Sequence, residues 1–265
     1  MISNVVINNM PTIGSDVPSI NRLPTRQQAV IRGKIADIVI ETFIDPADID
    51  YINARFMALN HQYRPFFWPA LQAIEKCLKA SLIFCGVPVR GKNFGHKLIS
   101  MANTLRPHDK VLEELKLAPA EQHSELERLN LWGTHDPMEF IASIEEYGDP
   151  SNRYNLFGSK YQASYLPKLD QIVWALRSKY IGNKALCGTG MNQMLDYAAY
   201  EQNFCFAPPN YKHDSFYGKF SLGATVPSIE AALKGLYGHR AIFEEWLKTN
   251  ITITQEEINE IRDRK

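Results

Sequence analysis

The chain has 265 residues, of which 45% are hydrophobic and 22% are charged. This composition is ordinary for a globular protein and argues against general disorder. Basic and acidic residues balance to a formal net charge of zero, so no field of the whole molecule draws it onto nucleic acid or anionic lipid. A nucleic-acid partner would have to be held by a local basic patch.

The cysteines predict neither a metal site nor a disulfide framework. They form no CxxC pair and have no neighbouring histidine at the spacing of zinc ligands. Two of them fall inside an apolar helical pattern, where a thiol acts as a small buried hydrophobe. We therefore expect reduced core thiols, no metal and no cofactor. The cysteines are Cys77, Cys85, Cys187 and Cys205.

The N-terminal residues 1–16 lack a basic stretch followed by an apolar run, so they do not have the pattern of a secretory signal. Nowhere does the sequence approach the roughly 18 consecutive apolar residues that a membrane helix needs. We therefore expect a cytoplasmic protein without a membrane partner. Residues 1–24 mix Asn, Pro, Ser and short apolar clusters and are predicted to form a loose arm.

Two helices are predicted in the first quarter of the chain. Thr25 and Gln28 have the spacing of a capping box and open a helix expected to reach about Thr42. A second start signal follows at Asp45 and Pro46, because Asp can cap a helix and Pro fits the first helical position. The apolar residues of this second helix recur at steps of three and four and predict a buried face of Ile49, Ile52, Phe56 and Leu59.

The strongest helical pattern runs from about Pro65 to Cys85 and has two clear sides. A polar stripe contains Glu75 and Lys79, a favourable pair four residues apart, and we expect Glu75 to be largely exposed. Gly86 is well placed to end the helix. The residues expected in the core are Leu71, Ile74, Leu78 and Leu82.

Further helical patterns follow, and no alternating strand pattern is longer than a few residues. The patterns before residue 182 cover about 96–105, 110–117, 119–129, 136–148 and 166–181. Beyond it we expect helices at about 190–202 and 227–248, and a short last helix capped by Thr254 and Glu257. Residues 203–226 are rich in aromatic residues, Pro and Gly and predict a long loop. The fold class is therefore all-α, with a helical domain over 25–182 and a C-terminal helical extension over 183–265.

Three motifs resemble those of the HEPN family (higher eukaryotes and prokaryotes nucleotide-binding). The stretch ALQAIEKCLKA at 70–80 resembles the signature helix of these domains. Gly86 follows it, and Gly95-His96-Lys97-Leu98 resembles the "GHxL" that opens the next family helix. Tyr147 with Arg153-Tyr154 resembles the "RY" that often precedes the last long helix. The motifs occur in the family's order over roughly residues 45–180.

The resemblance implies a HEPN-like helical bundle, frequent homodimerisation and one of two broad roles. Some members are metal-independent ribonucleases that use an Arg and a His four to six residues apart. Others lack that motif and act as nucleotide-binding, RNA-binding or protein-interaction modules. The fold alone does not choose between the two roles, so enzymatic activity stays open at this point.

A ribonuclease of this kind needs a His that moves a proton and an Arg that stabilises charge on the phosphate. Chance predicts roughly one Arg-to-His match of suitable spacing in this sequence, and three occur. In chain order the matches are Arg55 with His61, Arg90 with His96, and Arg128 with His135. The first pair is interpreted as a solvated helix edge, and Gly133 interrupts the helix expected to carry the third pair. The second pair lies in the loop that enters the motif helix and is the candidate catalytic pair.

A small anion or nucleotide site is predicted near His96. The alternatives are that Lys76 and Lys79 form the solvated face of their helix, that His96 caps its own helix and that Arg153 is a packed, hydrogen-bonded anchor. Farther on, residues 204–220 interleave aromatic and basic side chains, which either stack unpaired bases or cover the bundle. The candidate ligands of the anion site are Lys76, Lys79, Lys92, Asn93 and Arg153.

The pair on a late helix that is typical of the family's ribonucleases is missing, which favours a non-catalytic module that binds a nucleotide, RNA or a protein. The alternative is a metal-independent ribonuclease, of a toxin or defence type, that uses Arg90 and His96. The expected partners are therefore a nucleotide or RNA and a second copy of the chain.

Overall fold

A computed structural model of the chain describes residues 12–90, 94–154, 158–181, 205, 228–251 and 253–263. The regular elements over these residues are all helices, which confirms the predicted all-α class. None of the described helices is long and apolar enough to cross a membrane.

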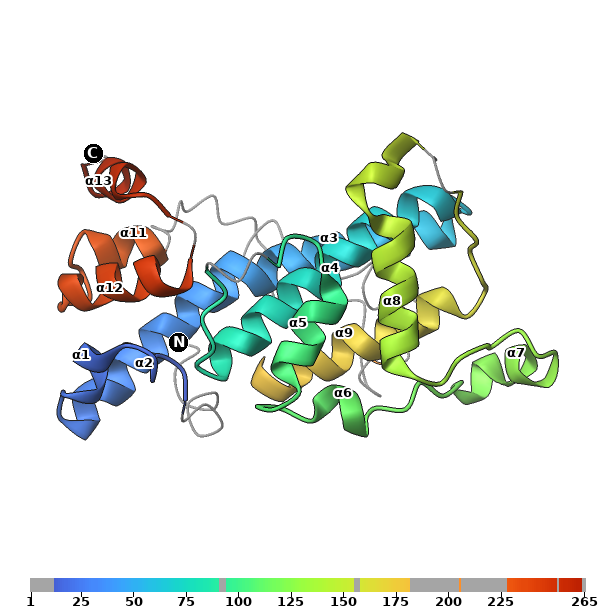
Figure 1. Cartoon of the computed structure of the whole chain (residues 1–265), viewed down its shortest axis with the longest axis horizontal. Helices are drawn as coiled ribbons and strands as arrows, with labels where there is room; N and C mark the ends of the chain where they lie inside the picture. Colours follow the sequence, from blue (N-terminus) through green and yellow to red (C-terminus); the bar gives the residue numbers. More distant parts are fainter. Residues whose placement is uncertain are drawn as a thin grey trace, which may run out of the picture.

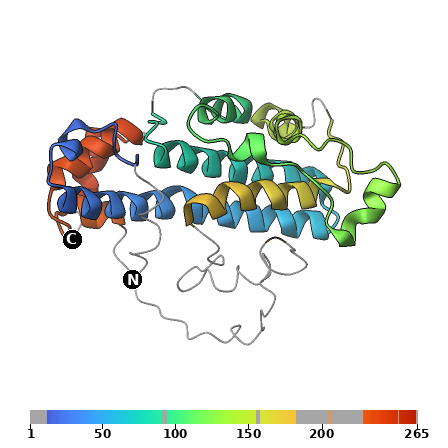
Figure 2. The same cartoon turned by 90° about the horizontal axis from the view of Figure 1, so that it is seen from below.

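The two helices predicted in the first quarter of the chain are one continuous helix. It consists of α2 (Thr25–Val39), a π-helical turn (Ile40–Ile44) and α3 (Asp45–Leu59). The backbone at both junctions is right-handed helical, and the Asp45 N–H bonds the carbonyl of Ile40, five residues back. The wider turn suits Pro46, which has no N–H to donate and whose ring would press on a carbonyl in a regular α-helix. This long helix extends along most of the molecule (Figures 1 and 2).

The capping box predicted at Thr25 is wrong. Thr25 is already the first helical residue, and its cap position is Pro24, which offers no side-chain hydrogen bond. Gln28 instead donates to the backbone carbonyls of Leu23 and Asn21. The side chain of Gln28 therefore ties the helix to the segment before it rather than closing a box.

The buried face predicted for α3 is also wrong. Phe56 is 56% exposed, and only Ile52 of the four predicted residues is buried. The face that packs inward is built largely from small residues, which let α3 approach α4 (Tyr63–Phe84) closely along its length. Its buried residues are Ala47, Tyr51, Ile52, Ala54, Arg55 and Ala58.

The central helix α4 follows its sequence pattern except at Glu75. Leu71, Ile74, Leu78 and Leu82 are all fully buried, as predicted. Glu75, expected to be largely exposed, is only 5% exposed. Gly86 ends the helix region with a φ of +72°, and a Cβ there would lie 2.6 Å from the carbonyl oxygen of Thr12. Glycine is therefore required both by the backbone conformation and by the close approach of the N-terminal segment.

The first core surrounds α4. Helices α3, α5 (Leu98–Leu105), α8 (Pro137–Gly148) and α9 (Tyr165–Ile181) pack against it (Figure 1). Helix α8 begins where the pattern over 136–148 predicts it, and Asp136 caps it, since its carboxylate accepts from the Met138 N–H at 2.8 Å. The helices expected over 110–117 and 119–129 are only short turns. The short elements are α6 (Val111–Glu114), a 3-10 turn (Glu121–His123), α7 (Ser124–Arg128) and a second 3-10 turn (Pro150–Tyr154).

A second core joins the two ends of the chain. It packs α1 (Pro18–Asn21), the second half of α2 and the end of α4 against α11 (Ser228–Leu233), α12 (Arg240–Asn250) and α13 (Gln255–Asp263). Residues 12–24 are therefore not a loose arm, because Ile13, Val17 and Ile20 are at most 1% exposed. Figures 1 and 2 show the blue N-terminal and red C-terminal helices together at one end of the molecule.

The C-terminal part differs from its prediction in one place and agrees in another. The helix expected over 227–248 is divided into α11 and α12 by a turn with left-handed Gly235 and Gly238. The capping box of α13 is confirmed, because Thr254 and Glu257 bond each other's backbone N–H at 3.1 and 2.7 Å. The helix expected at 190–202 and the aromatic-rich loop lie outside the described residues, apart from Cys205.

Candidate functional site

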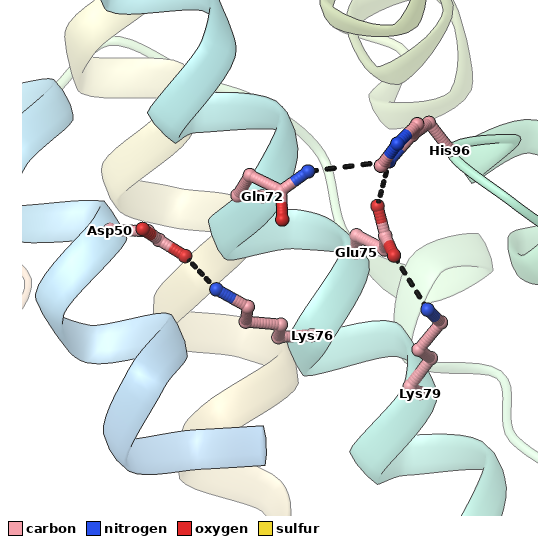
Figure 3. A network of polar contacts seen from close by, with 6 residues as sticks. All are labelled: Asp50, Gln72, Glu75, Lys76, Lys79 and His96. Atoms are coloured by element: carbon pink, nitrogen blue, oxygen red, sulfur yellow. Dashed lines mark hydrogen bonds and ion pairs between the residues drawn. The ribbon is translucent and has the colours of Figure 1, made fainter. Parts of the chain in front are cut away.

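Buried Glu75 is the centre of a polar cluster on α4 (Figure 3). Its Oε2 atom lies 2.7 Å from Nδ1 of His96, and its Oε1 atom accepts a hydrogen bond from Lys79 at 2.6 Å. The amide nitrogen of Gln72 lies 3.3 Å from the same His96 nitrogen. Since a carboxylate only accepts, a neutral His96 carries its proton on Nδ1 and presents Nε2 as an acceptor.

The segment before α5 brings His96 to this position. Phe94 is buried in the first core, and Gly95 reverses the chain with a φ of +51°. His96 then lies over Glu75 with 39% of its side chain exposed, whereas the Glu75 side chain is 7% exposed. The "GHxL" stretch therefore has a definite structural role, because it covers a carboxylate that would otherwise face water.

Each of the two α4 lysines that were predicted to bind an anion, Lys76 and Lys79, has a carboxylate partner. Lys79 pairs with Glu75 on the same helix, and Lys76 pairs with Asp50 of α3 (Figure 3). The charges of Lys76 and Lys79 are balanced by those of Asp50 and Glu75, so the cluster has a net positive charge only when His96 is protonated. An anion at either lysine would compete with a carboxylate that is already in place.

The remaining predicted ligands are not brought to this cluster by any described contact. Lys92 and Asn93 lie outside the described residues, and so does the side chain of Arg153, whose backbone belongs to the second 3-10 turn. Their assignment to a ligand site stays a prediction.

The described hydrogen bonds direct Arg90 and His96 to different partners. The Arg90 guanidinium donates to the carbonyl of Lys248 at the end of α12, whereas His96 bonds Glu75 of α4. Arg90 thus links the loop after α4 to the second core. Within the described part of the chain, no hydrogen bond or ion pair joins these two side chains.

The other two Arg-to-His matches are also tied into separate contacts. Arg128 pairs with Glu125 on the exposed face of α7, and His135 Nδ1 lies 2.7 Å from the Leu117 carbonyl. Arg55 is not at a solvated edge, as the sequence pattern indicated, because it is only 1% exposed.

Arg55 belongs to a buried network that periodicity did not predict. Its guanidinium donates to Asp170 of α9, and the Tyr51 hydroxyl donates to the other carboxylate oxygen at 2.5 Å. Burial raises the pKa of Asp170, and the charge of Arg55 opposes that rise. The only signal in the sequence is that Tyr51 and Arg55 share a helical face with Ala54 and Ala58. This network fastens α3 to α9 and exposes no group to solvent.

A pocket of about 560 Å³ adjoins the Glu75–His96 cluster. The end of α3, the first turns of α4 and the end of α8 form its walls. Trp68 lines it and meets the His96 ring edge to face, with 5.3 Å between the ring centroids. Its rim also carries Asp149, whose pKa is lowered by hydrogen bonds from the Ser151 side chain and backbone. Arg64, Met57 and Tyr147 also line this pocket.

Comparisons of the chain with protein-family models, with curated proteins and with solved structures find no match. The resemblance to HEPN domains therefore rests on the three sequence motifs alone. Within the described residues, no group of three or more His, Cys, Asp or Glu side chains could hold a metal ion.

Proposed function

We propose that the chain is a non-catalytic nucleotide-binding module whose ligand occupies the pocket beside His96. The observation that carries this proposal is the position of Trp68, whose indole is 38% exposed and lines a pocket of about 560 Å³. Small-molecule pockets typically measure roughly 300–1,000 Å³ and combine apolar walls with a few polar groups.

The lining suits a planar base with an attached phosphate. The base stacks on Trp68, with Met57 and Tyr147 supplying further apolar surface. Arg64 lies at the exposed side of the same pocket and offers a guanidinium to the phosphate. An unpaired base of single-stranded RNA would be accepted by the same surface, so RNA belongs to the same ligand class.

The contacts of Arg90 and His96 favour binding over ribonuclease activity. A His paired with a carboxylate can move a proton, but cleavage by the candidate pair also needs Arg90 at the same phosphate. Arg90 is instead bonded to Lys248, and Lys76 and Lys79 are paired with carboxylates. Homodimerisation through a HEPN-like surface remains an expectation from the sequence motifs.

Titration calorimetry with AMP, ADP and a short single-stranded RNA, all in EDTA, tests the proposal. Base stacking is worth about 1–3 kcal/mol, so Trp68→Ala should weaken binding tenfold or more. Phe56→Ala is the matched control, because it removes a ring that is 56% exposed on α3 and outside the pocket. Absence of binding to the folded wild-type chain, or equal losses in the two variants, would contradict the proposal.

The same RNA samples test the catalytic alternative. If the chain cleaves RNA in EDTA, and if His96→Ala abolishes the cleavage while His61→Ala leaves it intact, the chain is a metal-independent ribonuclease and not a non-catalytic binding module. His61 is a suitable control because its exposed side chain bonds Tyr63 where the turn after α3 meets α4, and it has no described contact with Glu75.

A further inference from the structure

The excursion formed by residues 117–135, here called the acidic lobe, projects from the first core. It contains the first 3-10 turn and α7, and Figure 1 shows it extending from one end of the molecule. The two ends of the lobe are bonded together, since the Leu117 N–H donates to the His135 carbonyl at 3.0 Å. The Leu117 carbonyl accepts from the Trp132 indole N–H, also at 3.0 Å.

The base of the lobe is fixed to α9. The side chain of Gln171 bonds both the N–H and the carbonyl of Ala118, at 3.1 and 3.0 Å. Lys168, which is 1% exposed, donates to the Trp132 carbonyl. These contacts fasten both chain segments at the base of the lobe, at Ala118 and at Trp132, to α9.

Two leucines at the tip are turned to solvent by this anchored frame. Leu129 is 54% exposed and Leu131 is 51% exposed, on either side of Asn130 with its left-handed φ of +58°. The next residue, Trp132, is 1% exposed, so the same turn that buries the anchor presents the leucines. The two leucines are two residues apart in the sequence, and a partner protein that covered both would remove their apolar surface from water.

The charge of the surrounding surface selects the partner. Residues 110–136 contain six acidic residues against three basic ones, a formal net charge of −3 in a chain whose total is zero. All six acidic side chains are exposed. Such a surface repels nucleic acid and attracts a basic protein segment. The acidic residues are Glu113, Glu114, Glu121, Glu125, Glu127 and Asp136.

A groove of about 840 Å³ begins at the base of the lobe. It lies between α5, α6 and the first turn of α8, and His135 belongs both to its lining and to the lobe. Its apolar lining includes Leu105, Leu112 and Met138. Three carboxylates, of Asp109, Glu113 and Asp136, line it together with two basic residues, Lys116 and Arg106, of which Arg106 pairs with Glu113. A groove with apolar walls and more carboxylates than cations accepts the apolar face of a basic amphipathic helix.

We propose that the acidic lobe and the adjoining groove bind a basic amphipathic helix of a partner protein. The helix places its apolar face in the groove and against Leu129 and Leu131, and its lysines or arginines face the exposed carboxylates of the lobe. This surface is separate from the pocket beside His96, because the two share no lining residue.

Fluorescence anisotropy with a labelled 18-residue helical peptide of leucine and lysine is the direct test. The wild-type chain should bind it saturably and should not bind the counterpart in which glutamate replaces lysine. The double variant Leu129→Ser with Leu131→Ser should weaken binding tenfold or more. Leu236→Ser, which changes a leucine that is 66% exposed in the turn between α11 and α12, should leave binding unchanged.

A second variant tests the charge without touching the apolar tip. Glu125→Gln with Glu127→Gln should weaken binding at low salt and reduce its salt dependence, because two exposed carboxylates are removed. Trp68→Ala should leave peptide binding unchanged, which separates this surface from the nucleotide pocket. Lack of saturable binding, or binding insensitive to the tip variant, overturns the proposal. So does a dimer in solution that the tip variant dissociates, since the partner would then be a second copy.

Discussion

Removal of the Asp170 carboxylate should destabilise the chain more than removal of any exposed ion-pair partner. The Arg55 and Asp170 side chains are 1% and 4% exposed, so Asp170→Ala leaves a guanidinium buried without its counter-charge. Breaking such a buried pair costs about 3–5 kcal/mol, and the Tyr51 hydroxyl loses its acceptor as well. This loss is a large part of a typical total stability of about 5–15 kcal/mol.

Urea unfolding followed by far-UV circular dichroism at pH 7 measures this loss. Asp50→Ala is the matched control, because it removes an aspartate whose pair with Lys76 is 21–27% exposed and should cost only about 1 kcal/mol or less. The apolar double variant Arg55→Met with Asp170→Leu should recover much of the loss, since no charge then remains buried. A cost for Asp170→Ala equal to that of Asp50→Ala would refute the reasoning.

Three further predictions concern single buried groups. Gly148→Ala should cost about 1–3 kcal/mol in the same urea assay, because its Cβ would lie 2.7 Å from the Phe67 carbonyl oxygen; an unchanged midpoint would contradict this close approach. Burial lowers the pKa of Lys168 from 10.5 to about 8, so between these pH values only the unfolded chain binds the proton. The free energy of unfolding should therefore rise with pH over this range by up to roughly 3 kcal/mol. The variant Lys168→Met should lack this rise. Burial raises the pKa of the Cys77 thiol to about 12, so mass spectrometry should find Cys77 unalkylated at pH 8 in the native chain and alkylated in urea; alkylation of the native chain would be the contrary result.

Local signals in the sequence were sufficient for several helices. The stripe through Leu71 and Leu78, with Gly86 after it, predicted the extent and buried face of α4 within two residues. The caps of α8 and α13 were also predictable, because Asp136 and Thr254 bond backbone groups within three residues of themselves. Such interactions depend on neighbours in the sequence and need no knowledge of the tertiary fold.

The errors arose where a distant segment decides the outcome. In α3 the large residue Phe56 suggested one face, but the alanines and Arg55 face inward because α4 approaches closely and Asp170 supplies the counter-charge. Glu75 has the spacing of an exposed ion pair, yet residue His96 covers it. The candidate site was therefore predicted only in part, since His96 and Lys79 do come together, around a carboxylate that the sequence pattern assigned to solvent.

The second core has a consequence for the order in which the chain folds during synthesis. Its residues include Ile13 and Val17 near one end of the chain and Trp246 and Ile258 near the other, whereas the buried residues of the first core lie between 47 and 176. The whole first core is therefore synthesised before the C-terminal helices that complete the packing around the isoleucines of α2. Until the last helices emerge, that strip of the nascent chain is exposed, and it is there that a chaperone would bind or a prematurely terminated chain would aggregate.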